Sequence, residues 1–336
     1  GILGQFSAVL SGPFPYVPEL KFFVTGRFLN SLDQLPWGYN KEREANAKLT
    51  YNLGTMKFSL SSQRFYRIYK PYSHAWKYFP DGYEVRKDYS WRDNLKLSHV
   101  LNPHTFYEAS LSFQRRYFNR YEPGRWAEFS PEGVFIASNY LTKSANTPPF
   151  WTNADNGIYI RNEVNTILAK LDLNSQIDRN NLVKAGVEFR GYGIDRLSYQ
   201  EPFASGFHAF EKYLKHPVEL SVYAQDKIEF DICIVNVGLR YDYVNVDDTH
   251  WPSIREPAGY LSNQRIWIPQ GEVATAAKQQ ISPRLGIAFP VSDRTVLYSS
   301  YGHFFQMPDY VDMYTLRDPT VDAAIVGNPA IAPQKT

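Results

Sequence analysis

Apolar and polar side chains alternate with a period of two along most of this chain, and no other feature constrains the fold as strongly. Within residues 233–243, Val237 and Leu239 fall on one side of the alternation and Asn236 and Arg240 on the other. Further stretches with the same alternation lie at 46–53, 105–117 and 183–190. Because successive side chains of a β-strand point to opposite sides, the pattern predicts strands with one apolar and one polar face.

The alternation predicts about twelve strands and no convincing helix, so the expected class is all-β. The expected strands lie at 4–12, 19–30, 44–53, 55–69, 88–101, 104–119, 159–177, 181–199, 215–229, 232–247, 279–289 and 293–305.

The connections between these strands alternate between short and long. Short turns are expected near 53–55, 102–103, 178–181, 230–231 and 290–293. Long loops are expected near 31–43, 70–87, 120–158, 200–214, 248–278 and 306–336. A soluble β-sandwich has no systematically long side, whereas an outer-membrane barrel has short periplasmic turns and long exterior loops. The pattern therefore predicts part of an antiparallel up-and-down transmembrane β-barrel.

Composition excludes several other classes. The net charge is +2, so no strong field attracts nucleic acid. The single cysteine, Cys233, allows neither an internal disulfide nor a zinc site built from cysteines. No apolar run reaches the roughly 18 residues of a transmembrane helix. Aromatic residues make up 16% of the chain, which suits sheets and membrane–water boundaries.

The sequence contains no convincing catalytic constellation. Nucleophile-elbow, zinc-protease, phosphate-loop and dinucleotide motifs are all absent. The seven histidines show no paired spacing; His74 and His208 fall in long loops, where a metal chelate could touch them, although a lone loop histidine is usually plain surface. We therefore expect no enzyme, and no catalytic, cofactor-binding or metal-binding residues.

Four segments in the C-terminal third resemble the barrel of TonB-dependent receptors, especially the large receptors of the Bacteroidetes. Residues 281–307 read ISPRLGIAFPVSDRTVLYSSYGHFFQM, like a hairpin typical of that family. Residues 223–227 (YAQDK) and 237–242 (VGLRYD) resemble two of its strands. The tail, 327–336, resembles the family's GNPxLxPxKT segment, with Ala330 to Ala332 as a mild departure. The resemblance covers 215–336 well and the rest by pattern.

The resemblance implies that residues 1–336 form part of a single receptor barrel of the Gram-negative outer membrane. It also implies a plug domain and further C-terminal strands, neither of which is present in this sequence. The implied partners are outer-membrane lipid, an imported ligand and a TonB-type energy-coupling protein, which would act through an N-terminal region. No nucleic acid partner and no cofactor is implied.

Two groups of candidate site residues follow. The first faces the lumen or the plug, where glycines admit a bulky neighbour and charges need partners. It consists of Gly238, Arg240, Asp242, Arg284 and Gly286. The second lies in extracellular loops, where aromatic rings could stack on a ligand or hold the loops together. It consists of Trp76, Tyr78, Trp126, Trp151, Trp251 and Trp267.

The function expected from the resemblance is active import of a scarce or bulky nutrient, with energy coupled from the inner membrane. An iron chelate, cobalamin, a glycan and a peptide all remain open as ligands. Two alternatives also stay open. One is a passive porin-like or non-transporting outer-membrane barrel. The other is a soluble or surface β-protein that binds glycans, which would bury its apolar faces in a core.

Overall fold

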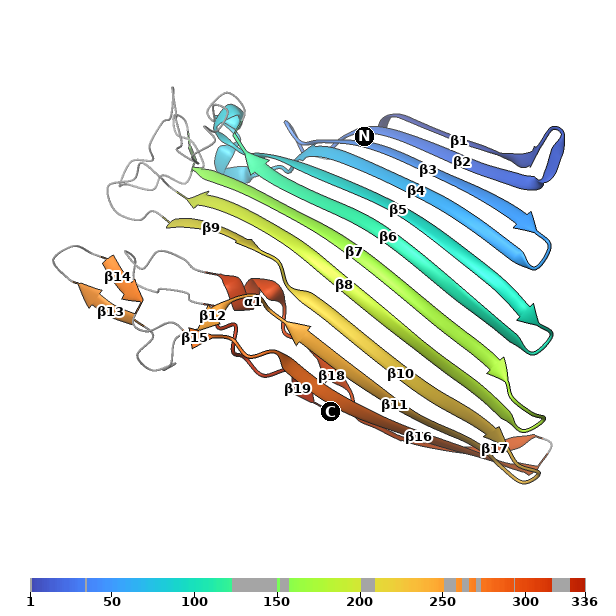
Figure 1. Ribbon diagram of the computed structural model, residues 1–336. Coiled ribbons are helices and arrows are strands. Elements are labelled where there is room, and N and C mark those ends of the chain that lie inside the picture. Colours follow the sequence, from blue (N-terminus) through green and yellow to red (C-terminus); the bar gives the residue numbers. More distant parts are fainter. Residues whose placement is uncertain are drawn as a thin grey trace.

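One antiparallel sheet dominates the described part of the chain. A computed structural model describes residues 2–33, 35–122, 150–151, 157–200, 209–250, 258–261, 266–269, 273–292, 294–315 and 327–335. Within these ranges the sheet has 13 strands, which lie side by side in a single layer (Figure 1). Nearly every strand pairs with its neighbour in the sequence, as an up-and-down topology requires.

The strands of this sheet match all twelve expected segments. Their bounds are β1 Ile2–Phe14, β2 Val17–Leu32, β3 Tyr39–Leu53, β4 Met56–Lys70, β5 Val85–Asn102, β6 Thr105–Tyr121, β7 Ile158–Gln176, β8 Asn181–Gln200, β9 Ala209–Lys215, β10 Val218–Glu229, β11 Ile234–Asn245, β16 Lys278–Ser292 and β17 Thr295–Gly302. The end strands β1 and β17 each pair on one side only.

The strand β9 corrects the expectation of a loop at 200–214. It pairs with the C-terminal part of β8, from Ile194 to Gln200. The strand β10 pairs with the preceding part of the same edge of β8. Pro217 separates the two strands because proline has no backbone N–H to donate to a neighbouring strand. The Pro217 carbonyl still accepts a hydrogen bond from the Tyr192 amide, at 3.0 Å.

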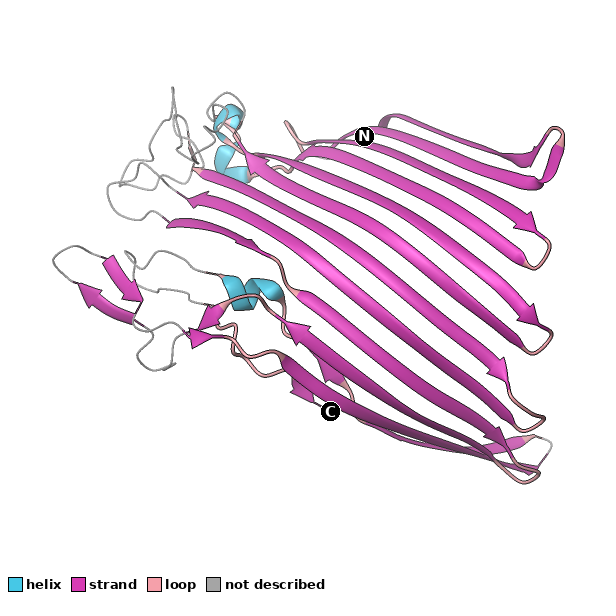
Figure 2. Ribbon diagram, in the orientation of Figure 1, coloured by secondary structure: helices cyan, strands magenta, loops and turns pink. Residues whose placement is uncertain are grey.

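Short helices and strands lie within the long connections (Figure 2). The helical elements are the 3-10 helices η1 His74–Trp76 and η2 Pro80–Gly82 and the α-helix α1 Tyr310–Tyr314. Three short strand pairs are also present: β12 Thr249–His250 with β15 Val273–Ala274, β13 Ala258–Leu261 with β14 Ile266–Pro269, and β18 Phe305–Gln306 with β19 Gln334–Lys335. The five-residue helix α1 was not predicted, since the sequence shows no convincing helical pattern. The last expected strand is also shorter than 293–305, because β17 ends at Gly302.

The short turns lie at one end of the sheet and the long connections at the other, as expected (Figure 1). Gly54 closes the β3–β4 turn with φ +56°, a left-handed conformation that glycine adopts without strain. Asp178 closes the β7–β8 turn by accepting hydrogen bonds from the backbone amides of Asn180 and Asn181, at 2.8 and 2.9 Å.

The strand register gives the sheet one apolar and one polar face. Residues paired across antiparallel strands lie on the same face. One row of the apolar face consists of Leu49, Leu60, Leu95, Leu111, Ala169, Phe189 and Leu220, each paired with the next. One row of the polar face consists of Thr50, Ser59, Lys96, Ser110, Lys170, Glu188, Ser221, Asp242 and Gln280.

Within the described ranges, no second layer of protein covers the apolar face. Leu95 is 50% exposed, Leu111 54% and Leu239 53%. The main buried cluster instead lies on the polar face near the long connections, where Met313 and Tyr314 of α1 pack against Ile194, Tyr213 and Val246. Among the described residues, no helix has the length and apolarity needed to cross a bilayer.

Candidate functional site

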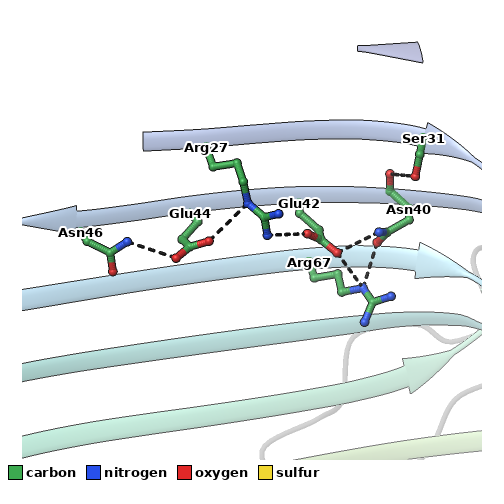
Figure 3. Close-up of polar contacts among 7 residues, drawn as sticks. All are labelled: Arg27, Ser31, Asn40, Glu42, Glu44, Asn46 and Arg67. Atoms are coloured by element: carbon green, nitrogen blue, oxygen red, sulfur yellow. Dashed lines mark hydrogen bonds and ion pairs between the residues drawn. The ribbon is translucent and has the colours of Figure 1, made fainter. Parts of the chain in front are cut away.

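The polar face carries linked charges that run from strand to strand. On β2 to β4, Arg27 donates from Nη2 to Glu42 at 2.9 Å, and its Nε lies 3.4 Å from Glu44 (Figure 3). Glu42 also lies 3.5 Å from the Nε of Arg67, and that Nε donates to Asn40 at 2.8 Å. The side-chain amide of Asn40 donates to Glu42 at 2.8 Å, so two arginines and an amide surround this carboxylate, which is 14% exposed.

This network was not predicted from the sequence. It also includes Asn46, which donates to Glu44 at 3.1 Å (Figure 3). A signal was present in β3, where Asn40, Glu42, Glu44 and Asn46 follow one another with a period of two. The partners could not be assigned, because Arg27 and Arg67 lie on neighbouring strands and the register was unknown.

A second polar region brings together residues from three of the segments that resemble the receptor family. Gly238, Arg240 and Arg284 line a hollow of about 260 Å³ together with Tyr223 and Gln225. The hollow lies on the polar face because Gly238 pairs with both Gln225 and Arg284. Three of the five predicted lumen-facing residues therefore share one site.

The hollow is rich in cations. Besides Arg240 and Arg284, it is lined by Lys170 and Lys184. Lys170 lies 3.0 Å from Asp172, and the Nε of Arg240 donates to Asp242 at 2.9 Å. Arg284 lies 5.3 Å from the ring of Phe304, a cation–π arrangement. The hollow therefore has the chemistry to accept a polar or anionic group.

The predicted charge Asp242 is buried and fully engaged by its own wall. Its side chain is 11% exposed and accepts a hydrogen bond from Ser221 at 2.7 Å as well as those from Arg240. A buried carboxylate needs such donors, because the loss of hydration is otherwise uncompensated. Arg240 and Asp242 therefore form an ion pair within β11, and the hydroxyl of Ser221 in the neighbouring strand β10 stabilises the carboxylate.

Glycines of the polar face make room for tyrosines of neighbouring strands. A Cβ at Gly186 would lie 2.5 Å from the ring of Tyr223, whose hydroxyl donates to Asp172 at 2.7 Å. A Cβ at Gly286 would lie 3.1 Å from the hydroxyl of Tyr298. Such aromatic rings covering glycines pin the register of a sheet. The structure thus fills the space at Gly286 with a side chain of the wall itself. At Gly238 an added Cβ would lie 3.0 Å from the Cβ of Gln225, although Gly238 also lines the hollow.

The predicted loop aromatics Trp76 and Trp151 stack on each other. Their ring centroids are 5.7 Å apart, and Tyr83 also stacks on Trp76, with a centroid distance of 5.9 Å. Trp76 is 5% exposed, which makes it a packing residue of the loop that follows β4. Tyr78 is 62% exposed and meets Phe150 edge-on at 5.4 Å. Of this cluster, Tyr78 therefore presents the most open surface to a ligand.

The other loop candidates can be placed only in part. Trp126, Trp251 and His208 lie outside the described residues. Trp267 lies in β14, where its backbone pairs with that of Tyr260. His74 lies against Phe150 and its Nδ1 is 2.8 Å from the hydroxyl of Tyr72. Within the described ranges, no group of three or more histidine, cysteine or acidic side chains could hold a metal.

The segment after β17 folds back onto the polar face. Tyr310 of α1 donates to Glu219 at 2.8 Å, and Tyr314 donates to the carbonyl of Val246. Burial, with Glu219 as the next cause, raises the pKa of the Tyr310 hydroxyl, so the hydroxyl keeps its proton. Lys278 of β16 donates to the carbonyl of Pro329, the last residue of the GNP segment 327–329. Side chains of β10 and β16 and the backbone carbonyl of Val246, which directly follows β11, therefore fix these residues to the wall.

Solved structures of outer-membrane import proteins share this fold. The copper transporter OprC is 11% identical with a TM-score of 0.65, over 99% of this chain and 48% of that one. The ferric-catecholate import receptor Fiu from Escherichia coli is 11% identical with a TM-score of 0.63, over 98% and 52%. The hemophore receptor HasR of Serratia marcescens, solved with HasA and heme, is 12% identical with a TM-score of 0.63, over 98% and 47%.

These likenesses show the fold alone, and the chain spans about half the length of these proteins. They confirm the expected partial antiparallel up-and-down β-barrel. No curated protein sequence matches the chain. The family described as TonB dependent receptor-like, beta-barrel matches residues 12–336, nearly the whole chain. The chain therefore belongs to the TonB-dependent receptors and forms part of their β-barrel.

Proposed function

We propose that this chain is about half of the wall of an outer-membrane receptor that actively imports a scarce or bulky nutrient. The observation that carries the proposal is the division between the two faces of the sheet. The apolar face, with Leu95 and Leu111 half exposed, suits lipid, and the polar face suits a lumen that is filled with protein and water. On this reading residues 1–336 are one part of a single barrel domain.

The polar face favours a plugged lumen over an open pore. Its charges are held in pairs such as Arg27 with Glu42 and Arg240 with Asp242, and the hollow at Gly238 leaves space against the wall. Barrels of about 22 strands in this class of transporter enclose a plug. We propose that Gly238, Arg240 and Arg284 face such a plug in the full receptor, and that Gly286 and Asp242 stabilise the wall beside it.

A plugged barrel does not pass solutes by diffusion, so the plug has to be remodelled. The outer membrane has no ATP and no ion gradient of its own, and the work must therefore come from the inner membrane. A TonB-type protein is the proposed partner for this step. The solved structures that share the fold are a copper transporter, a ferric-catecholate import receptor and a hemophore receptor. The ligand of this chain is left open among iron chelates, cobalamin, glycans and peptides. The proposed contacts are the loop aromatics; within the cluster of Trp76, Tyr78 and Trp151 that the structure describes, Tyr78 is the most exposed.

The apolar face bears on the soluble alternative. A soluble β-protein would bury its apolar rows in a core, but Leu60, Leu111 and Leu239 are 48%, 54% and 53% exposed. Exposed apolar rows that run across several neighbouring strands call for a lipid or protein partner. The passive-barrel alternative differs from active import in one measurable property: uptake through a passive barrel does not depend on the proton gradient of the inner membrane.

The test is uptake of a panel of labelled ligands by cells that express the full receptor, with and without a protonophore. The panel contains a ferric siderophore, cobalamin, an oligosaccharide and a peptide. We expect saturable uptake of one ligand that stops when the proton gradient is discharged, while surface binding persists. Uptake that rises linearly with concentration and ignores the protonophore would instead identify a passive channel.

A further inference from the structure

The polar face is covered by the chain itself near the long connections and is open toward the short turns. At the first end, Tyr310 and Tyr314 of α1 pack onto the wall. The hollow lined by Lys184 and Arg284 lies toward the other end, because Lys184 is close to the start of β8 at Asn181 (Figure 1). Its lining comes only from β7, β8, β10, β11 and β16. Among the described residues, the hollow therefore has no cover.

Four cations line the hollow, and none of its lining residues is acidic. The cations are Lys170, Lys184, Arg240 and Arg284. Two of them are paired within their own strands, Lys170 with Asp172 at 3.0 Å and Arg240 with Asp242 at 2.9 Å. In the part of the chain that the structure describes, no carboxylate lies within ion-pair distance of the other two. The hollow therefore carries two positive charges that this wall does not neutralise.

The carboxylates that pair with the first two cations have further donors of their own. Asp172 accepts a hydrogen bond from the hydroxyl of Tyr223 at 2.7 Å, and Asp242 accepts one from Ser221 at 2.7 Å. Neither carboxylate lines the hollow. Turning either of them toward another cation would leave these donors without an acceptor, which is costly in a buried site. The complement of the two unpaired charges must therefore come from outside this wall.

The two unpaired cations lie in one register row across the sheet. Lys184 pairs with Gln225, Gln225 with Gly238, and Gly238 with Arg284. Adjacent strands are about 4.8 Å apart, so the two cations arise from backbone positions roughly 14 Å apart. The hollow between them has a volume of about 260 Å³, many times the space that one water molecule needs. It can therefore hold two carboxylates, one beside each cation.

We propose that an acidic segment of the plug occupies this hollow and places one carboxylate against Lys184 and another against Arg284. The inference rests on the proposed function, since it requires that the barrel encloses a plug. A plug that packs against the wall removes water from both cations, and an uncompensated buried charge is strongly destabilising. The guanidinium of Arg284 suits a carboxylate, to which it can donate two parallel hydrogen bonds. This wall thereby specifies the charge of a plug segment that lies outside the sequence.

The first experiment identifies the partner of Lys184 by zero-length cross-linking of the purified full-length receptor. A carbodiimide activates a carboxylate, and a lysine amine in contact with it then forms an amide bond. Peptide mass spectrometry should find Lys184 joined to an aspartate or glutamate of the plug. Lys170 is the internal control, because it should be joined to Asp172, which lies 3.0 Å away. Joining of Lys170 without joining of Lys184, or joining of Lys184 only to the wall, would overturn the proposal.

The second experiment removes the two unpaired charges from the full-length receptor. The test variant is Lys184→Gln with Arg284→Gln. The matched control is Lys48→Gln with Lys57→Gln, which removes the same charge from the polar face outside the hollow. Cleavage of the plug by an added protease should be on the order of 100-fold faster in the test variant, because the plug carboxylates lose their partners, and unchanged in the control. Equal rates in the test variant and the parent, or equal increases in both variants, would contradict an acidic contact at the hollow.

The two experiments also separate this inference from the proposed function. Energy-dependent uptake by a receptor that fails both tests would refute only the acidic contact. Uptake that ignores a protonophore would refute the proposed function, whichever group Lys184 contacts.

Discussion

Arg115 and Arg116 are neighbours in the chain and lie on opposite faces of the sheet. Arg115 pairs in register with Trp91 and lies 2.9 Å from Glu163 on the apolar face. Arg116 pairs with Ser90 and Val164 on the polar face. Two arginines of one strand therefore lie in different environments. The effect of a substitution on stability depends on which face of the sheet the side chain occupies.

The first prediction tests this dependence on β11. Val237 is 45% exposed on the apolar face, whereas Asn236 lies on the polar face. In the full receptor, Val237→Arg should cost roughly 2–4 kcal/mol of folding free energy if the position lies near the bilayer midplane. Asn236→Arg should be mild, because a charge there faces the lumen. The measurement is denaturant-dependent folding into lipid vesicles, and equal sensitivity at the two positions would contradict the assignment of the faces.

The second prediction concerns the glycine beneath Tyr223. A Cβ at Gly186 would lie 2.5 Å from the ring of Tyr223 and 2.7 Å from a carboxylate oxygen of Asp172. Gly186→Ala should therefore destabilise the folded receptor by about 1–3 kcal/mol, since the ring has to move off the wall. Gly26→Ala is the control, because its nearest contact would be an ordinary 4.0 Å. A control as damaging as Gly186→Ala would show that any side chain at a strand glycine is disruptive.

The third prediction concerns pH and the β7–β8 turn. Hydrogen bonds from the backbone amides of Asn180 and Asn181 hold the pKa of Asp178 below its usual range. A carboxyl group with a lowered folded-state pKa contributes stability above its unfolded pKa, and this stability is lost as the pH falls through the folded value. Asp178→Ala should therefore lower stability at neutral pH and make no difference at strongly acidic pH. A penalty that persists unchanged in acid would show that the charge of Asp178 is irrelevant to the turn.

The fourth prediction concerns the isolated chain. In the described structure β1 and β17 have open edges, and the apolar face is uncovered. Open edges and exposed apolar rows favour aggregation in water. Residues 1–336 alone should therefore give no cooperative thermal unfolding transition in the absence of detergent or lipid. A sharp transition from a soluble monomer, followed by circular dichroism and light scattering, would favour the soluble alternative.

The sheet could be predicted because period-two alternation is a local property. Each of the twelve expected segments is long enough for the pattern to stand out, and turns such as Asp178 to Asn181 carry their own signal. The strand β9 was missed because Pro217 follows it closely and its seven residues join a loop. The five-residue helix α1 is too short to show a helical period, and contacts of Tyr310 and Tyr314 with distant strands stabilise it.

The candidate site could be predicted only where a single strand carries it. Gly238 and Arg240 were recognised within one segment, and the structure places them with Arg284 around one hollow. The network of Arg27 and Glu42 depends on the register between β2 and β3, and this register could not be read from the sequence. Runs such as Gln114 to Arg116 also hide the face of each residue, because consecutive polar side chains obscure the alternation.

The most direct test of the receptor wall is a scan for lipid contact along β11. In a full receptor with Cys233→Ser, single cysteines at positions 236 to 240 are labelled with a fluorophore, and quenching by a nitroxide-labelled lipid is measured in vesicles. Quenching should be strong at Val237→Cys and Leu239→Cys and weak at Asn236→Cys and Arg240→Cys, because the register alternates between lipid and lumen. Uniform quenching, or none at any position, would contradict a membrane-spanning wall.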